Sequence, residues 1–321
     1  YSYPSEAGGT PPIIDGVIIT GGGGLDLEGG GMANYNVRPI LRDVLFIGNN
    51  SESWGGGLYT NNGLPTLERV TFKNNRAKDF GGGIAVYGGS ISLKDVTFIG
   101  NTARQGGGLY TILNGTCDAD VVNVTFLGNT ASEWGGGMQN NACSPTVVNS
   151  VFTGNTVTGI FGNINGAGAA VMNYGGSFPT FINVTITGNN ANGNGGGMLN
   201  HSSTPTLVNT ILYGNTAAIA GPGIYNVTGT YGIPDGSALI SYSDLQDSGG
   251  SGTGWNALQG VDGGHNIDQD PRFADANGPD DTFGTADDLP RLLLDSPARD
   301  AGDNSTLPAG LLTDLLGWTR L

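Results

Sequence analysis

The chain has 321 residues, of which 59 are glycine, only 12% are charged and 37% are hydrophobic. Its net charge of -15 would repel a nucleic-acid backbone, and no stretch reaches the roughly 20 apolar residues that cross a bilayer, so nucleic-acid binding and a membrane-spanning segment are excluded. Acidic, lysine-poor surfaces are common in secreted proteins, and we expect an extracellular or cell-surface protein.

The chain starts with an irregular N-terminal extension, residues 1–12, which contains three prolines and no pattern of a capping helix. A strongly β-forming segment, 13–19, follows and is expected to be the first strand. Such a strand exposes unpaired backbone groups unless something covers it. Because the first residue is Tyr1 and not methionine, we expect that a signal peptide was removed or that the sequence starts inside a longer protein.

Two motifs then recur along the chain. Glycine triplets followed by an apolar residue, two of them degenerate, start 25 to 33 residues apart, at Gly29, Gly55, Gly81, Gly106, Gly135, Gly168, Gly195 and Gly221. Between them a Phe-x-x-Asn motif returns at Phe46, Phe72, Phe98, Phe126 and Phe152, and it continues with another apolar residue in place of phenylalanine at Ile186–Asn189 and Leu212–Asn215. Two independent motifs with a common spacing are a strong signal of a repeat architecture.

Each repeat contains short apolar runs, such as residues 65–72, that are rich in β-forming residues and lack helical spacing. One repeat cannot bury its apolar face alone, whereas coils stacked about 4.8 Å apart pair every strand in parallel and share one core. We therefore predict an all-β fold, a right-handed parallel β-helix over residues 13–273 with about eight coils and an irregular C-terminal tail.

The side-chain alternation is interrupted once in each coil, which indicates a corner. Val70 and Phe72 share one parity, whereas Leu67 does not. Asparagine and aspartate tolerate the left-handed backbone that a bend requires, and they dominate this column: Asp43, Arg69, Asp95, Asn123, Asn149, Asn183 and Asn209. We predict an asparagine ladder at the corner, and opposite charges facing each other between the first three coils, where Arg42, Glu68 and Lys94 form the preceding column.

Aromatic and charged side chains precede several glycine triplets. Trp54, Phe80 and Trp134 stand directly before a triplet, where they either pack against the next coil or stack on sugar rings, and we name them as possible glycan contacts. Asp79, Arg104 and Glu133 stand nearby and could hold a sugar acid or could be solvated turn residues. The two histidines, His201 and His265, form no triad-like or metal-binding pattern and are interpreted as structural.

The two cysteines lie at equivalent positions in adjacent coils. Cys117 and Cys143 each stand four residues before a valine of the repeat, Val121 and Val147. Their Cα atoms should therefore be about 5 Å apart, within the range of a disulfide, which fits an oxidising compartment.

At these residues the chain resembles bacterial surface proteins with parallel β-helix repeats, including the polymorphic outer-membrane proteins. The closest instance is Gly81–Ile84 combined with Phe98–Asn101, which reproduces a Gly-Gly-x-Ile motif and a Phe-x-x-Asn motif. The segment 264–273 resembles the final coil of such proteins. Members of this group are mostly adhesins, surface proteins and secreted proteins, so the resemblance implies fold and location more than activity.

The C-terminal tail, residues 274–321, is acidic at its start. Six potential oxygen ligands occur within fourteen residues, Asp275, Asn277, Asp280, Asp281, Asp287 and Asp288, which predicts a possible Ca²⁺ site, although Pro279 departs from the EF-hand pattern. A plain solvated loop is the alternative. The apolar patches at 292–294 and 311–312 need a partner surface, on a neighbouring subunit or on the chain's own β-helix.

Three functions fit this sequence. The first is an extracellular structural protein that self-associates end to end, through its first coil and its tail, into a fibre or surface array. The second is an adhesin that binds polysaccharide or the surface of a host or neighbouring cell. The third is a polysaccharide lyase or glycoside hydrolase, which would require a carboxylate cluster; the one sizeable insertion, 158–166, contains no ionisable residue and argues against it.

Overall fold

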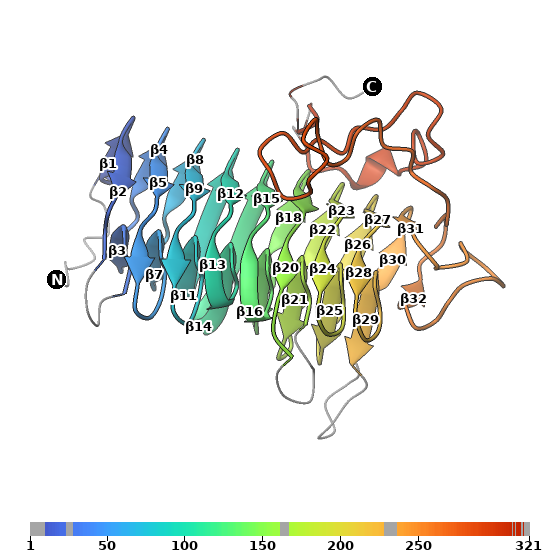
Figure 1. Cartoon of the computed structure of the whole chain (residues 1–321), viewed down its shortest axis with the longest axis horizontal. Helices are drawn as coiled ribbons and strands as arrows, with labels where there is room; N and C mark the ends of the chain where they lie inside the picture. Colours follow the sequence, from blue (N-terminus) through green and yellow to red (C-terminus); the bar gives the residue numbers. More distant parts are fainter. Residues whose placement is uncertain are drawn as a thin grey trace.

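The structure is a computed structural model and describes residues 10–23, 28–160, 167–227 and 236–309, together with 311, 313–315 and 317. Most of the N-terminal extension, residues 161–166 of the insertion, and Leu312 of the second apolar patch lie outside the described residues. The described part is a parallel β-helix in which coils stack side by side along a rod (Figure 1). The predicted fold class is thus confirmed.

The first sheet forms two adjoining rows of parallel strands. One row contains β1 (Ile13–Asp15), β4 (Ile40–Arg42), β8 (Thr66–Glu68), β11 (Ile84–Lys94), β14 (Leu109–Val122), β18 (Thr146–Val148), β22 (Thr180–Ile182), β26 (Thr206–Val208), β30 (Leu239–Ser241) and β32 (Val261–Asp262). The other row contains β3 (Met32–Tyr35), β7 (Leu58–Asn61), β17 (Met138–Asn141), β21 (Val171–Tyr174), β25 (Met198–His201) and β29 (Ile224–Val227). The long strands β11 and β14 belong to both rows and join them.

Two further sheets complete each coil. The second sheet contains β2 (Ile18–Thr20), β5 (Leu45–Ile47), β9 (Thr71–Lys73), β12 (Thr97–Ile99), β15 (Thr125–Leu127), β19 (Val151–Thr153), β23 (Thr185–Thr187), β27 (Ile211–Tyr213) and β31 (Asp244–Leu245). The third contains β6 (Asn50–Ser51), β10 (Arg76–Ala77), β13 (Thr102–Gln105), β16 (Thr130–Trp134), β20 (Thr156–Val157), β24 (Asn190–Ala191) and β28 (Thr216–Ala217). Within the described residues the second sheet has nine strands, so the rod has about nine turns, one more than expected.

The core is a set of columns in which equivalent residues of successive coils stack. The phenylalanines of the Phe-x-x-Asn motif stack nearly parallel, with ring centroids 4.4 to 5.2 Å apart from Phe46 to Phe152, and all are fully buried. Burial of large apolar side chains at this density supplies most of the folding free energy. Each phenylalanine of the motif therefore occupies the same core position in its own coil.

The asparagine of the same motif forms a second, buried ladder that the sequence analysis did not foresee. Its members are Asn49, Asn75, Asn101, Asn129, Asn155, Asn189 and Asn215. The Oδ1 atom of Asn101 accepts from both the backbone N–H and the side-chain amide of Asn75, at 3.0 and 3.1 Å. Its Nδ2 atom donates to the carbonyl of Phe72 at 2.8 Å. The ladder thus pairs backbone groups at a bend where no sheet can do so.

The predicted corner is present. All seven residues of its column have positive φ angles, between 51° and 56°. Asn123 donates to Asp95 at 2.9 Å and Asn149 donates to Asn123, so part of the predicted ladder forms. The expected charge pairs form between two coils, since Arg42 lies 3.0 Å from Glu68 and Arg69 lies 2.8 Å from Asp43.

The C-terminal tail runs back along one side of the rod (Figure 1). It is joined to the last coil by a bridge between Phe273 and Leu292 and contains a short 3-10 helix, η2 (Asn304–Thr306). Asn209 of the corner column holds it by accepting from the backbone N–H of Asp303 at 2.7 Å and donating to the carbonyl of Asp303 at 2.9 Å. Of the two arrangements left open by the sequence, the one observed is a tail folded against its own β-helix.

Candidate functional site

A cleft of about 840 Å³ lies between the β-helix and the tail. Its floor is built from two adjacent columns of five successive coils. One is the corner column, Asn149, Asn183, Asn209, Tyr242 and His265; the other is the outward column next to it, Val151, Thr185, Ile211, Asp244 and Ile267. Because neighbouring coils are about 4.8 Å apart, the cleft follows the rod axis for about 19 Å.

The roof of the cleft comes from the tail and combines apolar and charged side chains. Its apolar members include Leu289, Leu292, Leu293 and Leu315, and its charged members are Arg291, Arg299, Asp300 and Asp314. The floor presents side-chain amides and hydroxyl groups from the repeat next to Val151, Ile211 and Ile267. Both walls of the cleft therefore mix polar and apolar groups.

Asp244 is the unusual residue of the floor. Its side chain is 2% exposed, its Oδ1 atom accepts from the backbone N–H of Gln269 at 3.1 Å, and its Oδ2 atom is buried without a hydrogen-bond partner. Burial, together with the nearby carboxylates of Asp268 and Asp270, raises the pKa of Asp244 to about 6. The Nδ2 atom of Asn183, also in the floor, is a buried donor without a partner. Both unpaired atoms belong to residues that line one cleft.

The acidic start of the tail docks onto the side of the rod. Asp288 accepts from the hydroxyl of Thr153 at 3.1 Å and from the backbone N–H of Gly284 at 2.6 Å. Phe283 lies against Gly188, and Gly284 lies against Gly128 and Gly154. In these coils the residue before the motif asparagine is glycine, and its missing side chain leaves room for the tail.

Gly154→Ala is expected to release this segment of the tail, because a Cβ there would overlap the backbone of Gly284. Gly48→Ala is the matched control. Gly48 and Gly154 have the same left-handed backbone, with φ of 63° and 62°, so both variants lose about 1 kcal/mol to strain, but a Cβ at Gly48 meets nothing within 4 Å. Limited proteolysis should cut residues 275–290 faster in Gly154→Ala only; equal rates in the two variants would show that the tail is not held there.

Most of the predicted Ca²⁺ ligands lie exposed on the tail. Asp275, Asp280, Asp281 and Asp287 are exposed, and Asp288 is occupied by its bonds to Thr153 and Gly284. Within the described residues, which include the whole segment, no group of three or more carboxylate, histidine or cysteine side chains is placed to hold a metal. Burial raises the pKa of Asp288, whereas a hydrogen bond from Thr285 lowers that of Asp287.

Calcium binding therefore stays a prediction, in which the ion would draw the exposed carboxylates together and order the segment. EDTA should then speed protease cleavage between Asn277 and Pro290, and added Ca²⁺ should slow it. Digestion patterns that are identical with EDTA and with Ca²⁺ would contradict the site.

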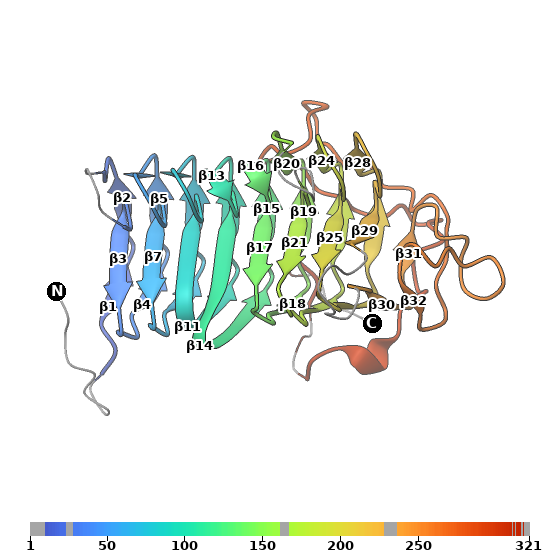
Figure 2. The same cartoon turned by 90° about the horizontal axis from the view of Figure 1, so that it is seen from below.

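The aromatic residues named as possible glycan contacts lie outside the cleft lining. Trp54 and Phe80 pack on each other at 4.3 Å between ring centroids, and both contact the buried Tyr110. Trp134 stacks on Tyr174 at 6.1 Å. These rings are half-buried along the side of the rod formed by β7, β11, β14, β17 and β21, which faces the viewer in Figure 2. Stacking on sugar rings stays a prediction for them.

Asp79, Arg104 and Glu133 form one ion cluster across three coils. Arg104 lies 3.3 Å from Asp79 and 2.9 Å from Glu133, and its guanidinium lies 4.9 Å from the ring centroid of Phe80. Glu133 also accepts from Gln105 at 2.9 Å. The cluster links three neighbouring coils. Its contribution to stability is modest, because the side chain of Arg104 is more than a third exposed and solvent screens its ion pairs.

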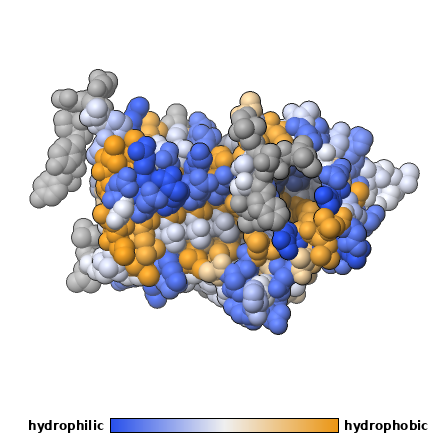
Figure 3. All heavy atoms as spheres, turned by 90° about the horizontal axis from the view of Figure 1, so that it is seen from above, coloured by the Kyte–Doolittle hydropathy of each residue, from blue (hydrophilic) through white to orange (hydrophobic). Residues whose placement is uncertain are grey.

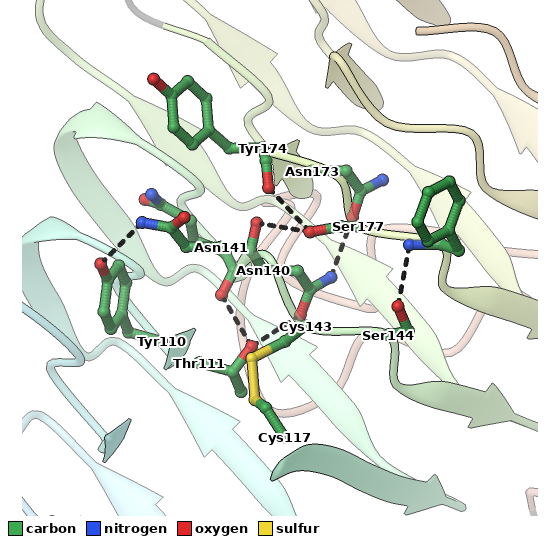
Figure 4. The surroundings of a disulfide bond; sticks show 12 residues. Tyr110, Thr111, Cys117, Asn140, Asn141, Cys143, Ser144, Asn173, Tyr174 and Ser177 are labelled. Carbon is green, nitrogen blue, oxygen red and sulfur yellow. Dashed lines mark hydrogen bonds between the residues drawn. A yellow bond between two sulfur atoms is a disulfide. The ribbon is translucent and has the colours of Figure 1, made fainter. Parts of the chain in front are cut away.

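Cys117 and Cys143 form a disulfide between adjacent coils, with Cα atoms 5.2 Å apart (Figure 4). Beside it, Asn140 donates to Asn173 at 2.9 Å and Thr111 donates to Asn140 at 3.0 Å, continuing an inner polar column.

The double variant Cys117→Ala/Cys143→Ala should lose about 3 kcal/mol of unfolding free energy. Thiol labelling of the denatured, unreduced protein should find no free thiol; two reactive thiols would contradict the bond.

Comparison with known proteins gives one finding on family. Residues 43–61, 69–87 and 95–112 match the Chlamydia polymorphic membrane protein repeat. Each stretch begins at a corner residue and contains one Phe-x-x-Asn motif and one glycine triplet. No curated protein and no solved structure matches the chain. These repeats and the parallel β-helix together fit a bacterial surface β-helix repeat protein, and no helix of the described residues is long and apolar enough to cross a membrane.

Sequence reasoning missed the cleft but a signal for it was present. The outward column next to the corner reads Ile18, Leu45, Thr71, Thr97, Thr125, Val151, Thr185, Ile211 and Asp244. Asp244 is its one charged member. A column-by-column alignment of the repeats would have marked this residue as an exception, although it could not have shown that the tail covers it.

Proposed function

We propose that this protein is a bacterial surface β-helix that binds an extended polysaccharide in the cleft beneath its C-terminal tail. The combination of polar and apolar side chains along one long cleft is the observation that carries the proposal. A sugar ring has hydroxyl groups around its edge and an apolar face of C–H groups. The amides and hydroxyls of the floor suit the edge, and the leucines of the roof suit the face.

The shape of the cleft supports a polymer over a compact ligand. The floor repeats two column positions along the axis at the spacing of the coils, so an extended chain suits its length better than a compact ligand does. Among the corner asparagines, Asn209 is bonded to the tail and Asn149 donates to Asn123, which leaves Asn183 as the one with an unpaired amide nitrogen. The unpaired Nδ2 of Asn183 offers a ready donor to a hydroxyl or ring oxygen. A buried donor without a partner is costly, and a ligand oxygen would remove that cost.

Titration calorimetry with hexasaccharides tests the proposal, using cellohexaose, N-acetylchitohexaose and fully deacetylated chitohexaose. Thr185→Val removes one floor hydroxyl with little change in volume and should weaken binding about threefold or more, the size of one hydrogen bond. Thr97→Val is the control, because Thr97 holds the same column position in a coil that does not line the cleft. Equal losses in the two variants, or no binding by any hexasaccharide, would contradict the proposal.

The same incubations distinguish binding from cleavage. Intact hexasaccharides after prolonged incubation are expected for a binding protein. Shortened products would put the lyase or hydrolase alternative first.

End-to-end association is a second candidate, favoured by the first coil. Val17 belongs to the inward column of Val44 and Val70, which are 2% and 0% exposed, yet Val17 is 40% exposed. Ile13 and Ile18 beside it are 57% and 66% exposed, and hydrophobic residues gather at this end in Figure 3. We propose that a second copy stacks on this end.

Light scattering over a range of concentrations checks the association. Val17→Lys should shift the population toward monomers, because it places a charge in the contact, whereas Thr71→Lys on the outward face of a later coil should not. A wild-type protein that is monomeric at every concentration would contradict it.

A further inference from the structure

The buried carboxylate of Asp244 indicates which kind of ligand the cleft would bind. A buried carboxylate is costly unless a cation or several donors face it, and the Oδ2 atom of Asp244 has neither. The ion pairs formed by the described residues do not include Asp244. The described residues therefore leave this negative charge unmatched.

The charges around the cleft reinforce that negative character at Asp244. The carboxylates of Asp268 and Asp270 lie close enough to act on it electrostatically. The two guanidinium groups of the lining belong to Arg291 and Arg299 in the roof, and Arg299 lies 3.9 Å from Asp300. A positive group entering the cleft would find its most favourable position at Asp244.

A neutral hydroxyl could donate to Oδ2, but it would leave the charge in place. An ammonium group donates and neutralises at once, and such charge-assisted bonds are about twice as strong as neutral ones. The unpaired Nδ2 of Asn183 requires an acceptor oxygen in the same cleft. One ligand class carries both an ammonium group and acceptor oxygens on a ring, namely an amino sugar with a free amine.

We propose that the cleft selects saccharides that carry a free amino group, and that Asp244 pairs with this ammonium group. The inference rests on the proposed function, since it names the sugar class of the same site. It requires no residue beyond those of the floor. Selectivity would come from charge, because the free and acetylated amino sugars share the same ring.

The experiment compares three trisaccharides near neutral pH by titration calorimetry: deacetylated chitotriose, N-acetylchitotriose and cellotriose. The wild-type protein should bind deacetylated chitotriose at least tenfold more tightly than the other two. Asp244→Asn keeps the acceptor for Gln269 and the side-chain volume but removes the charge, so it should abolish this preference and bind the three trisaccharides with affinities within twofold of one another. Asp120→Asn, an exposed residue of β14 outside the cleft, makes the same change in net charge and should bind as wild type does.

Three results would overturn the inference, and they are distinguishable. Equal affinity for the three trisaccharides would refute the charge selection and leave polysaccharide binding intact. No binding of any trisaccharide would refute the proposed function and this inference with it. Binding of Ca²⁺ alone to the wild type, lost in Asp244→Asn, would assign the carboxylate to a metal ion. Far-ultraviolet circular dichroism of each variant confirms that the β-helix is intact.

Discussion

Asn101→Ala is expected to lower the free energy of unfolding by about 4 kcal/mol, a large effect for a polar side chain. The substitution removes the acceptor of the Asn75 backbone N–H and the donor to the Phe72 carbonyl. Both groups would be left unpaired in a region where Asn101 is fully buried, and each such loss costs roughly 1 to 3 kcal/mol. Water cannot reach them without opening the coil.

Urea denaturation followed by circular dichroism measures this effect. Thr102→Ala, at the next residue and exposed, is the control and should change stability by no more than about 0.5 kcal/mol. A small loss in Asn101→Ala, similar to that of the control, would mean that the buried ladder is dispensable and that sheet pairing alone sets the coil.

Asp244→Asn is expected to raise stability, and only above the acidic range. Burial raises the pKa of Asp244 to about 6, compared with 3.8 for the unperturbed group. The folded protein therefore holds this proton more tightly than the unfolded chain, so the contribution of Asp244 is most favourable below pH 3.8 and is lost as pH rises through 6. A shift of this size corresponds to about 3 kcal/mol at full ionisation.

Denaturation curves at several pH values test this sign. The asparagine variant should match the wild type near pH 4 and exceed its stability by up to about 3 kcal/mol near pH 8. The free energy of unfolding of Asp120→Asn should change with pH as that of the wild type does over the whole pH range. A variant that is less stable than the wild type at the higher pH would show that the Asp244 carboxylate has a favourable partner inside the folded chain. The expected gain also fits a residue kept for a ligand, since such sites often lower stability.

The coil could be predicted from the sequence because its physics is local and repeated. The phenylalanine column, the corner column and the equivalent cysteines each follow from one spacing applied many times. The inward direction of the motif asparagine did not follow, because Asn is equally common at exposed turns and only the stacked backbone shows which groups it must satisfy. The charge pairing of the first coils was predictable since it needs only the register.

The tail could not be predicted for the opposite reason. Its contacts join residues far apart in the chain, such as Thr153 with Asp288 and Asn209 with Asp303, and no repeat specifies them. Composition alone identified the acidic and apolar segments of the tail, but it did not show which part of the β-helix the tail would pack against. The cleft exists only where these two unrelated parts meet, which is why its residues escaped the analysis of motifs.

The buried asparagine ladder makes the length of the rod a modular quantity. Each asparagine of the ladder bonds only to residues of its own coil or of the adjacent coils. A whole coil can therefore be lost or gained, and every remaining asparagine still meets an equivalent partner. Removing residues 70–95, for example, would join Arg69 directly to Val96, which occupies the position of Val70. Coils duplicated in this N-terminal half would leave the cleft untouched, because its floor begins at Asn149. Each added coil would carry the cleft about 4.8 Å farther from the opposite end, so gene duplication can change the reach of the proposed binding site without changing its chemistry.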